Sequence, residues 1–325
     1  MVDTALTDPL RLGSRHGALA DAQAREVAAA LAEAGHAVEI VSVGADEDAA
    51  RAALRAGECD LLVHPLKALP VAQPDGLVIA AIPLREDARD AAVTRDGMPL
   101  HQLPIGATVG AGSARRVAQV RIRNPRVDVQ ATAGGVDERL QRVADGELDA
   151  VIVSVEDLNR LSPQPRGLAF EPLGLAEWPT TAGQGAIAVE TTADADVALL
   201  DALAALDHLP TRLAVTAERQ VPAGLDADHT APVAVHAVLQ DDVLRVRAIV
   251  YSEDGFSRVS ADLTQPVGET VALDAGYIRS KGSGKGADAA DGDHPITRAA
   301  RAGSQVAHRL LERGAADLAP RESPL

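Results

Sequence analysis

Cysteine is almost absent from this chain, whose 325 residues include only Cys59. One thiol cannot close an internal disulfide, and small domains of oxidising compartments usually carry several. We therefore expect a reduced, cytoplasmic setting for the protein.

Long apolar runs are also missing. A membrane-spanning helix needs about 20 consecutive apolar residues, and no stretch of the sequence reaches that length. The opening residues MVDTALTDPLRLGSR contain no basic segment followed by an apolar one, so no secretory signal is expected. The sequence thus predicts neither a membrane span nor a membrane partner.

Basic charge is scarce, and lysine contributes to it only at Lys67, Lys281 and Lys285. The net charge of -16 repels phosphates, which argues against non-specific binding of nucleic acid. The nine histidines show no paired ligand spacing, so we expect no metal site. The glycine-rich segments 110–112 and 282–286 lack the spacing of a dinucleotide or phosphate loop, so no nucleotide site is expected either.

What the sequence does contain is a repeated alternation of apolar strands and amphipathic helices. Strands are predicted at Leu10–Gly13, Ala37–Val43, Leu61–His64 and Leu77–Ile82, and helices at Ala18–Ala34 and Asp48–Ala56. This alternation is typical of a parallel sheet covered by helices on both faces.

A second unit repeats the plan, and a third region differs from both. The second has predicted strands at Ala107–Val109, Val127–Gln130, Ala150–Ser154 and Gly185–Glu190, and helices at Ala114–Arg123, Val136–Ala144 and Val197–Leu206. From Thr211 a helix precedes alternating strands at 233–239, 244–251 and 259–263, and an amphipathic helix follows over about 296–313. This region predicts a small α+β domain with an antiparallel sheet.

Cationic side chains recur where a predicted strand gives way to a helix. They are Arg15, Lys67, the pair Arg115 and Arg116 behind Ser113, and Arg139. A single arginine on a helix commonly only interacts with solvent. However, helix N-termini carry free N–H groups, and the carboxyl ends of parallel strands share one sheet edge. Five cations at such positions therefore favour a binding site for a polyanion.

Eight segments of the sequence are informative because of the order in which they follow one another along the chain. They are RLGSRHGALADAQ, CDLLVHPLKALPVAQPDGL, REDARDAAV, VGAGSARRVAQV, AGGVDERL, DGELDAVIVSVEDLNRL, AGQGAIAVE and VTAER. In order and spacing, this set resembles the porphobilinogen deaminase (hydroxymethylbilane synthase) family over nearly the whole chain. The weakest coverage falls on Gly44–Ala56 and on the loop after Tyr277.

The resemblance implies an α/β fold of two periplasmic-binding-protein-like lobes with a small C-terminal α+β domain. The first lobe would comprise residues 1–90 and 184–206, the second 91–183, and the C-terminal domain 207–325. In that domain the family attaches dipyrromethane to a cysteine. The activity implied is that of a transferase of tetrapyrrole and porphyrin biosynthesis, which polymerises porphobilinogen into hydroxymethylbilane.

The same resemblance implies roles for individual residues. The family's arginines hold the acetate and propionate groups of pyrroles, and matching positions gives carboxylate-binding roles to Arg15, Lys67, Ser113, Arg115, Arg116, Arg139 and Arg160. Cys59 matches a buried small residue of the family, which predicts a core position for it and not a nucleophilic one.

The chain departs from the family at two chemical positions. His229 stands where the family has the cysteine that bears the cofactor, and imidazole is a poorer group than a thiolate for forming a thioether. Ala68 stands where the family has its catalytic aspartate. Loss of a group aimed at developing charge typically costs about two to three orders of magnitude in rate.

Further departures weaken the substrate site. Ala133 replaces an arginine, the segment between Val43 and Gly57 is too short for the family's lysine-containing loop, and Gly17, Ala111 and Gly112 replace residues with hydroxyl groups. Together with Ala68 and His229, these changes predict that no residue is catalytic, that no cofactor is used and that dipyrromethane is not covalently attached.

Three hypotheses follow, and whether the chain is an enzyme stays open at this point. The first is an active synthase with unusual residues. The second is a family member whose polymerisation is impaired or lost and which binds an anionic pyrrole, a linear tetrapyrrole or another carboxylate. The third is a structural or regulatory partner of another enzyme. We expect a monomer with a small anionic ligand. Replacing Arg115 and Arg116 by alanine is expected to abolish ligand binding and leave the fold intact.

Overall fold

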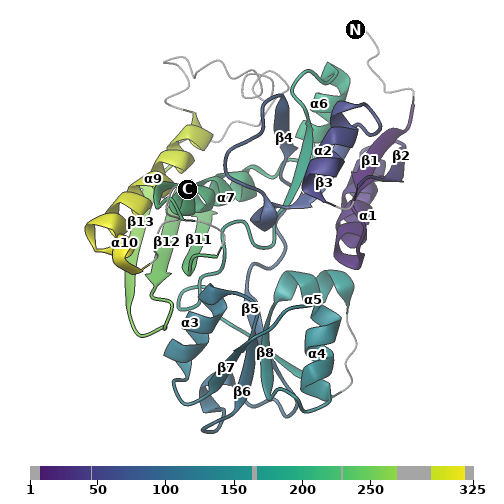
Figure 1. Ribbon diagram of the computed structural model, residues 1–325. Helices are drawn as coiled ribbons and strands as arrows, with labels where there is room; N and C mark the ends of the chain where they lie inside the picture. The colour runs from purple at the N-terminus through teal and green to yellow at the C-terminus, as the bar shows by residue number, and fades with distance from the viewer. Residues whose placement is uncertain (1–7, 45, 163–166, 228–229, 269–293, 319–325) are drawn as a thin grey trace. The chain divides into compact units, whose positions relative to one another are not determined.

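The computed structural model describes residues 8–44, 46–162, 167–227, 230–268 and 294–318 (Figure 1). The chain divides into two units. The first comprises Met1–Glu86, Gly185–Leu213 and Gly268–Arg298, and the second Asp87–Gln184, Ala214–Val267 and Ala299–Leu325. The finer division into two lobes and a C-terminal domain, with the boundaries given above, stays a prediction.

The first unit is built on a five-stranded sheet in the order β2-β1-β3-β10-β4. Its strands are β1 (Leu10–Ser14), β2 (Val38–Ser42), β3 (Leu61–Pro65), β4 (Leu77–Ala81) and β10 (Ile187–Thr192). β1 pairs in parallel with β2 and β3, whereas β10 runs antiparallel to β3 and β4. The prediction of a wholly parallel sheet is therefore wrong. β10 returns from a distant part of the chain and not through a strand–helix–strand crossover, which is the connection that enforces parallel pairing.

Helices α1 (Ala18–Glu33), α2 (Glu47–Arg55) and α6 (Val197–Ala204) cover this sheet. One face carries a core that joins Leu12 and Leu61 to Leu31 of α1 and Leu200 of α6. The opposite face carries a core that joins α2 to a neighbouring set of side chains, Val43, Cys59, Leu62 and Leu77. Adjacent strand residues point to opposite faces, so Leu61 and Leu62 serve different cores. The predicted covering of both faces is confirmed.

Cys59 lies inside this second core with 2% of its surface exposed. Burial raises the pKa of its thiol to about 11, so the nucleophilic thiolate is disfavoured at neutral pH. The predicted core position of Cys59 is confirmed.

The second unit contains another five-stranded sheet, in the order β7-β6-β8-β5-β9. Its elements are β5 (Asp90–Thr94), β6 (Thr108–Ala111), α3 (Ala114–Arg123), β7 (Asp128–Ala131), α4 (Val136–Ala144), β8 (Ala150–Ser154), α5 (Val155–Leu161) and β9 (Ala169–Pro172). β6 is parallel to β7 and β8, whereas β5 is antiparallel to β8 and β9. β5 and β9 were not predicted, because DAAVT and AFEP are short and have little apolar periodicity.

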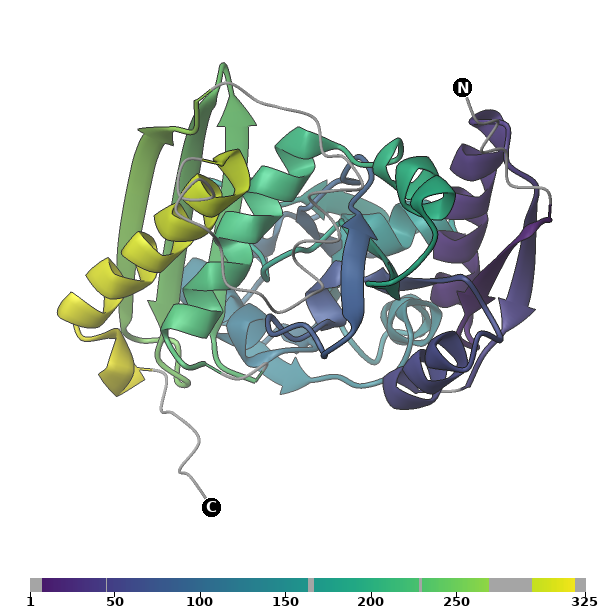
Figure 2. The same ribbon diagram turned by 90° about the horizontal axis from the view of Figure 1, so that it is seen from above.

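The same unit includes a three-stranded antiparallel sheet of β11 (Val233–Gln240), β12 (Val243–Tyr251) and β13 (Arg258–Pro266). Helix α7 (Leu209–Gly224) lies beside α9 (Pro295–Glu312) along this sheet, and the short α10 (Ala315–Leu318) follows α9 (Figure 2). Helix α3 contributes Ala118 to a core with Ile249 and Tyr251 of β12. The predicted fold class, two α/β sheets with a small α+β part, is confirmed.

Within the described ranges, no helix has the length and apolar character needed to cross a membrane.

We predict that Gly303→Val loosens the packing of α9 against α7. A Cβ built at Gly303 would clash with the backbone oxygen of Ala217, and backbone cannot move aside as a side chain can. Overpacking of this kind costs about 1–3 kcal/mol. Urea unfolding should show this loss for Gly303→Val and little change for Ser304→Val, which adds a branched side chain at an exposed neighbouring position. Equal midpoints for the two variants would contradict the close helix contact.

Candidate functional site

A single buried carboxylate organises the predicted site residues of the second unit. Asp90 opens β5 and is fully buried. Arg115 Nη1 donates to its Oδ2 at 2.8 Å, and Arg116 Nη2 donates to its Oδ1 at 2.7 Å. Trp178 Nε1 and Gln184 Nε2 also donate to this carboxylate, each at 3.0 Å. The structure thus brings the predicted arginine pair together around an acid that the sequence analysis had assigned no role.

Local sequence places the pair there. Ser113 is the N-cap of α3, and its hydroxyl accepts a hydrogen bond from the Arg116 backbone N–H at 3.3 Å. The first turn of α3 therefore starts beside the carboxyl ends of β6 and β8. Arg115 Nη1 also donates to Gln119 Oε1 at 2.7 Å, one helical turn along. Ser113 acts in the described structure as a helix cap.

Electrostatics fix the charge state of this cluster. Burial by itself raises the pKa of Asp90, but the attraction of Arg115 and then of Arg116 outweighs it and holds that pKa well below its usual range. Asp90 is therefore ionised at neutral pH. One carboxylate faces two guanidinium groups, and the acid Asp157 also lies close enough to attract Arg116.

Arg139 adds a third guanidinium. It lies in the first turns of α4, and a Cβ built at Gly112 would lie 2.9 Å from Arg139 Nη1. Burial, followed by the repulsion of Arg116, lowers the pKa of Arg139. The Nε atoms of Arg116 and Arg139 are buried and meet no hydrogen-bond partner in the part of the chain that the structure describes. Buried donors without partners are costly, so this location fits an anion.

Arg160 differs from these three. Its Nη1 donates to Glu156 Oε2 at 2.7 Å, and the two side chains are 5% and 1% exposed. The pair spans one turn of α5, so an acid of its own helix already balances the charge of Arg160. The proposed carboxylate-binding role of Arg160 stays a prediction, and this geometry does not favour it.

The remaining predicted residues belong to the first unit. Arg15 follows β1, and its Nε is buried without a hydrogen-bond partner among the described residues. Helix α1 begins after Gly17, whose φ of 132° is a value that glycine accommodates best. Lys67 and the exposed Ala68 belong to the single-turn 3-10 helix η1 (Leu66–Ala68). His229 lies outside the described residues.

A second buried ionic group in the first unit was also missed. Glu190 of β10 accepts from Arg51 of α2 at 2.8 and 2.9 Å, and His64 Nε2 lies 3.4 Å from Glu190 Oε2. This group links α2 to β10 and to β3, the strand that precedes η1. A signal was available for both missed acids: Asp90 and Glu190 are charged residues in or beside apolar strand segments, and such residues are almost never buried unless paired.

Fold and site together define an α/β protein with buried arginines clustered at the ends of its strands. The sequence model described as "Porphobilinogen deaminase, dipyromethane cofactor binding domain" matches residues 10–199. A porphobilinogen deaminase of Leifsonia xyli is 40% identical, with 96% of this chain and 94% of that protein covered. One of Thermobifida fusca is 38% identical, with 95% of each covered. The chain belongs to the porphobilinogen deaminase family.

Solved structures give a more distant likeness. A periplasmic substrate-binding protein of an ABC transporter from Coxiella burnetii is 16% identical with a TM-score of 0.41, and covers 62% of this chain and 93% of its own. A BvgS VFT2 domain of Bordetella pertussis is 21% identical with a TM-score of 0.38, and covers 60% of this chain and 84% of its own.

The family match corrects one expectation. The departures at Ala68, His229 and the substrate site predict no cofactor and no attached dipyrromethane. That prediction is wrong about the cofactor, because the matching family model is that of the dipyrromethane cofactor-binding domain. Replacements at single positions are weaker evidence than the ordered similarity of residues 10–199.

The structure also indicates that removing both arginines would destabilise the fold. Double replacement of Arg115 and Arg116 would leave Asp90 ionised and buried with no cation beside it, which is strongly unfavourable. A loss of ligand binding in that variant would therefore be mixed with a loss of stability.

We predict that Asp90→Asn lowers the free energy of unfolding by about 3–5 kcal/mol, because it leaves two buried guanidinium groups without their carboxylate. Asp87→Asn is the matched control. Asp87 pairs with Arg89 near the surface, with side chains 23% and 42% exposed, so its loss should cost under about 1 kcal/mol. Chemical denaturation measures both values. Similar values for the two variants would contradict the central role of Asp90.

The pH dependence should differ as well. The folded pKa of Asp90 is depressed, so its stabilising contribution is present above the unfolded value of about 3.9 and is lost as pH falls below it. Denaturation at a series of pH values should show this slope in the wild type and a shallower one in Asp90→Asn. Parallel curves below about pH 4 would count against the ionised, paired state of Asp90.

Proposed function

We propose that this chain acts in tetrapyrrole biosynthesis as a binder of acidic pyrroles, and that its porphobilinogen-polymerising transferase activity is impaired. The observation that carries the binding part is the pair of buried Nε donors of Arg116 and Arg139 without protein partners in the described structure. Pyrroles with acetate and propionate groups offer the carboxylates that such donors accept. Family membership supplies the substrate class.

The donor set of the second unit fits the cofactor of the family. Dipyrromethane brings two pyrrole rings with acidic side chains. Arg116 and Arg139 would hold a carboxylate, while Arg115 keeps Asp90 charged and in place. The residues of this chain thus supply binding, orientation and a positive potential. Arg15 and Lys67 of the first unit are proposed to hold further carboxylates.

The feature that supports an impaired transferase activity is Ala68. Its methyl group is exposed at the end of η1, next to Lys67, and it can neither accept a hydrogen bond nor stabilise a cation. At this position the family has an aspartate that faces developing positive charge, and loss of such a group costs about two to three orders of magnitude in rate.

Complete loss of catalysis is the alternative, in which the chain serves only as a binding protein for an anionic pyrrole, a linear tetrapyrrole or another carboxylate. The same arginines support that role. We further propose a cytoplasmic monomer as the working form, on the grounds of the single cysteine and the family membership.

We predict that Ala68→Asp raises the rate of porphobilinogen consumption by about 10²–10³-fold, because it restores a carboxylate at the end of η1. The exposed position should accept the larger side chain. Ala68→Asn is the matched control, since it has nearly the same shape without the charge. Equal rates for wild type, Asp and Asn variants would refute the impairment argued from this residue, whatever the ligand affinity.

We predict that Arg139→Gln weakens porphobilinogen binding by roughly 10- to 100-fold, the effect of losing one charge-assisted hydrogen bond. Isothermal titration calorimetry measures the affinity. Arg142→Gln, on the same helix and paired with Glu147 at the surface, should bind as the wild type does. If both variants bind equally tightly, the site at the ends of β6 and β8 is wrong.

A further inference from the structure

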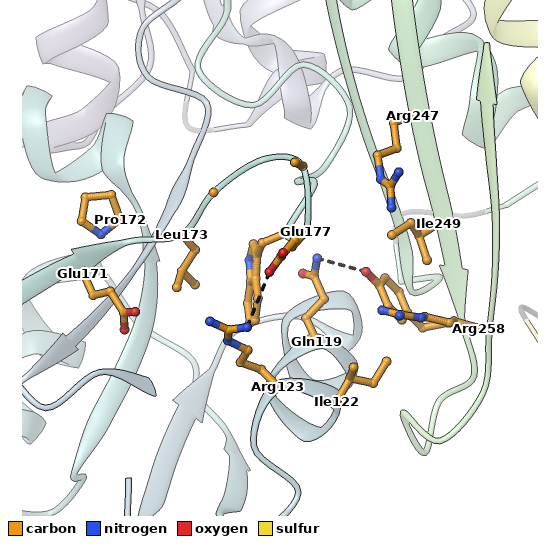
Figure 3. Close-up of a pocket in the computed structure, with 14 residues that line it drawn as sticks. Gln119, Ile122, Arg123, Glu171, Pro172, Leu173, Glu177, Arg247, Ile249 and Arg258 are labelled. Atoms are coloured by element: carbon orange, nitrogen blue, oxygen red, sulfur yellow. Dashed lines mark hydrogen bonds and ion pairs between the residues drawn. The ribbon is translucent and has the colours of Figure 1, made fainter. Parts of the chain in front are cut away.

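The second unit holds a pocket apart from the donors of Arg116 and Arg139. It has a volume of about 730 Å³ and lies among α3, the segment after β9, and strands β12 and β13 (Figure 3). Pockets of roughly 300–1,000 Å³ are the size that buries small organic ligands. The pocket's walls include the apolar side chains of Ile122, Leu173 and Ile249.

Three arginines from three different elements line this pocket: Arg123 at the end of α3, Arg247 on β12 and Arg258 at the start of β13. Arg123 and Arg258 enter from opposite sides, with Gln119 between them (Figure 3). Two acids, Glu171 and Glu177, line the same pocket, so its three arginines outnumber its acids by one. This excess of positive charge, in a chain with a net charge of -16, indicates a site for negative groups.

Protein acids neutralise these arginines only in part. Arg123 lies 3.5 Å from Glu177, whose side chain is 83% exposed, and such exposed pairs contribute little. Arg247 pairs with Asp262 through Nη1 at 3.0 Å, but its Nε is buried and has no hydrogen-bond partner among the described residues. No ion pair of Arg258 is found within those same residues. Donors therefore remain for a ligand.

Hydrogen bonds hold two side chains of the pocket lining, Gln119 and Trp178, in place. Gln119 Nε2 donates to Tyr251 Oη at 3.3 Å and to the Pro179 backbone oxygen at 2.8 Å. Trp178 also lines the pocket and is held from behind by its hydrogen bond to Asp90. A preformed lining lowers the entropy cost of binding, since few side chains must be ordered.

We propose that this pocket is an accessory binding site for a small aromatic dicarboxylate. The apolar walls suit a planar ring, and the guanidinium groups on opposite sides suit two separate carboxylates. This inference does not depend on the proposed function, because it involves neither Ala68 nor Arg139.

The pocket contains its own reporter, because Trp178 is the one tryptophan of the chain. Titration of the full chain with isophthalate should change tryptophan fluorescence saturably. Isophthalamide, which has the same shape without charge, and glutarate, which has two carboxylates without a ring, should bind at least tenfold more weakly. Equal responses to all three compounds would overturn the proposed ligand class.

Variants locate the response. Arg123→Gln and Arg258→Gln should each weaken isophthalate binding by tenfold or more. Arg245→Gln removes the same charge from an exposed position of β12 outside the pocket lining, and should bind as the wild type does. Arg139→Gln should also keep the response, which separates this pocket from the pyrrole site.

Two results would contradict the proposal. One is a wild-type titration without saturation. The other is a response that survives in Arg123→Gln and Arg258→Gln but disappears in Arg139→Gln, which would place the ligand at the pyrrole site. Circular dichroism and urea unfolding of each variant establish that the fold is intact before affinities are compared.

Discussion

The described site of the second unit depends on one ionic contact, the buried carboxylate of Asp90 between Arg115 and Arg116. Two guanidinium groups cannot be buried side by side without a counter-charge, and the sheet supplies that charge from the first residue of β5. Asp90 therefore offsets the free-energy cost of burying both guanidinium groups in the folded protein, whether or not a ligand is bound. What remains is a site with buried guanidinium donors that no described protein group accepts.

This arrangement separates two roles that the sequence analysis had merged. Arg115 is bound to Asp90 and Gln119 and acts as a positioning residue, and Ser113 caps a helix. Arg116 and Arg139 retain buried donors that no described protein group accepts. The proposed carboxylate ligand would relieve the cost of leaving those donors unpaired, and its binding would stabilise the folded protein.

Much of the fold could be predicted from periodicity. The helix that starts at Ala18, the helix Val136–Ala144 and the strand Ala150–Ser154 agree with the structure to within a residue or two. The antiparallel directions of β5 and β10 could not be predicted. Strand direction depends on where the chain enters a sheet, and a local sequence pattern does not contain that information. The cations of the site were found because helix starts are readable. Their partners Asp90 and Glu156 were not found, because ion pairing across elements is a tertiary property.

The family membership concerns what the protein binds, whereas the departure at Ala68 concerns its reaction rate. Similarity along nearly the whole chain shows the family, whose cofactor is dipyrromethane. In the proposed function, Ala68 affects the reaction rate alone, because it lies at the end of η1 in the first unit and does not belong to the Asp90 cluster. Binding and turnover can therefore fail independently.

A crystal structure of the protein with bound porphobilinogen would locate the carboxylates of the ligand relative to the Asp90 cluster. We expect a ligand carboxylate within hydrogen-bond distance of Arg116 Nε and the Arg139 guanidinium, with Asp90 still held by Arg115 and Arg116. A bound pyrrole that leaves both of those guanidinium groups without a carboxylate partner would contradict it.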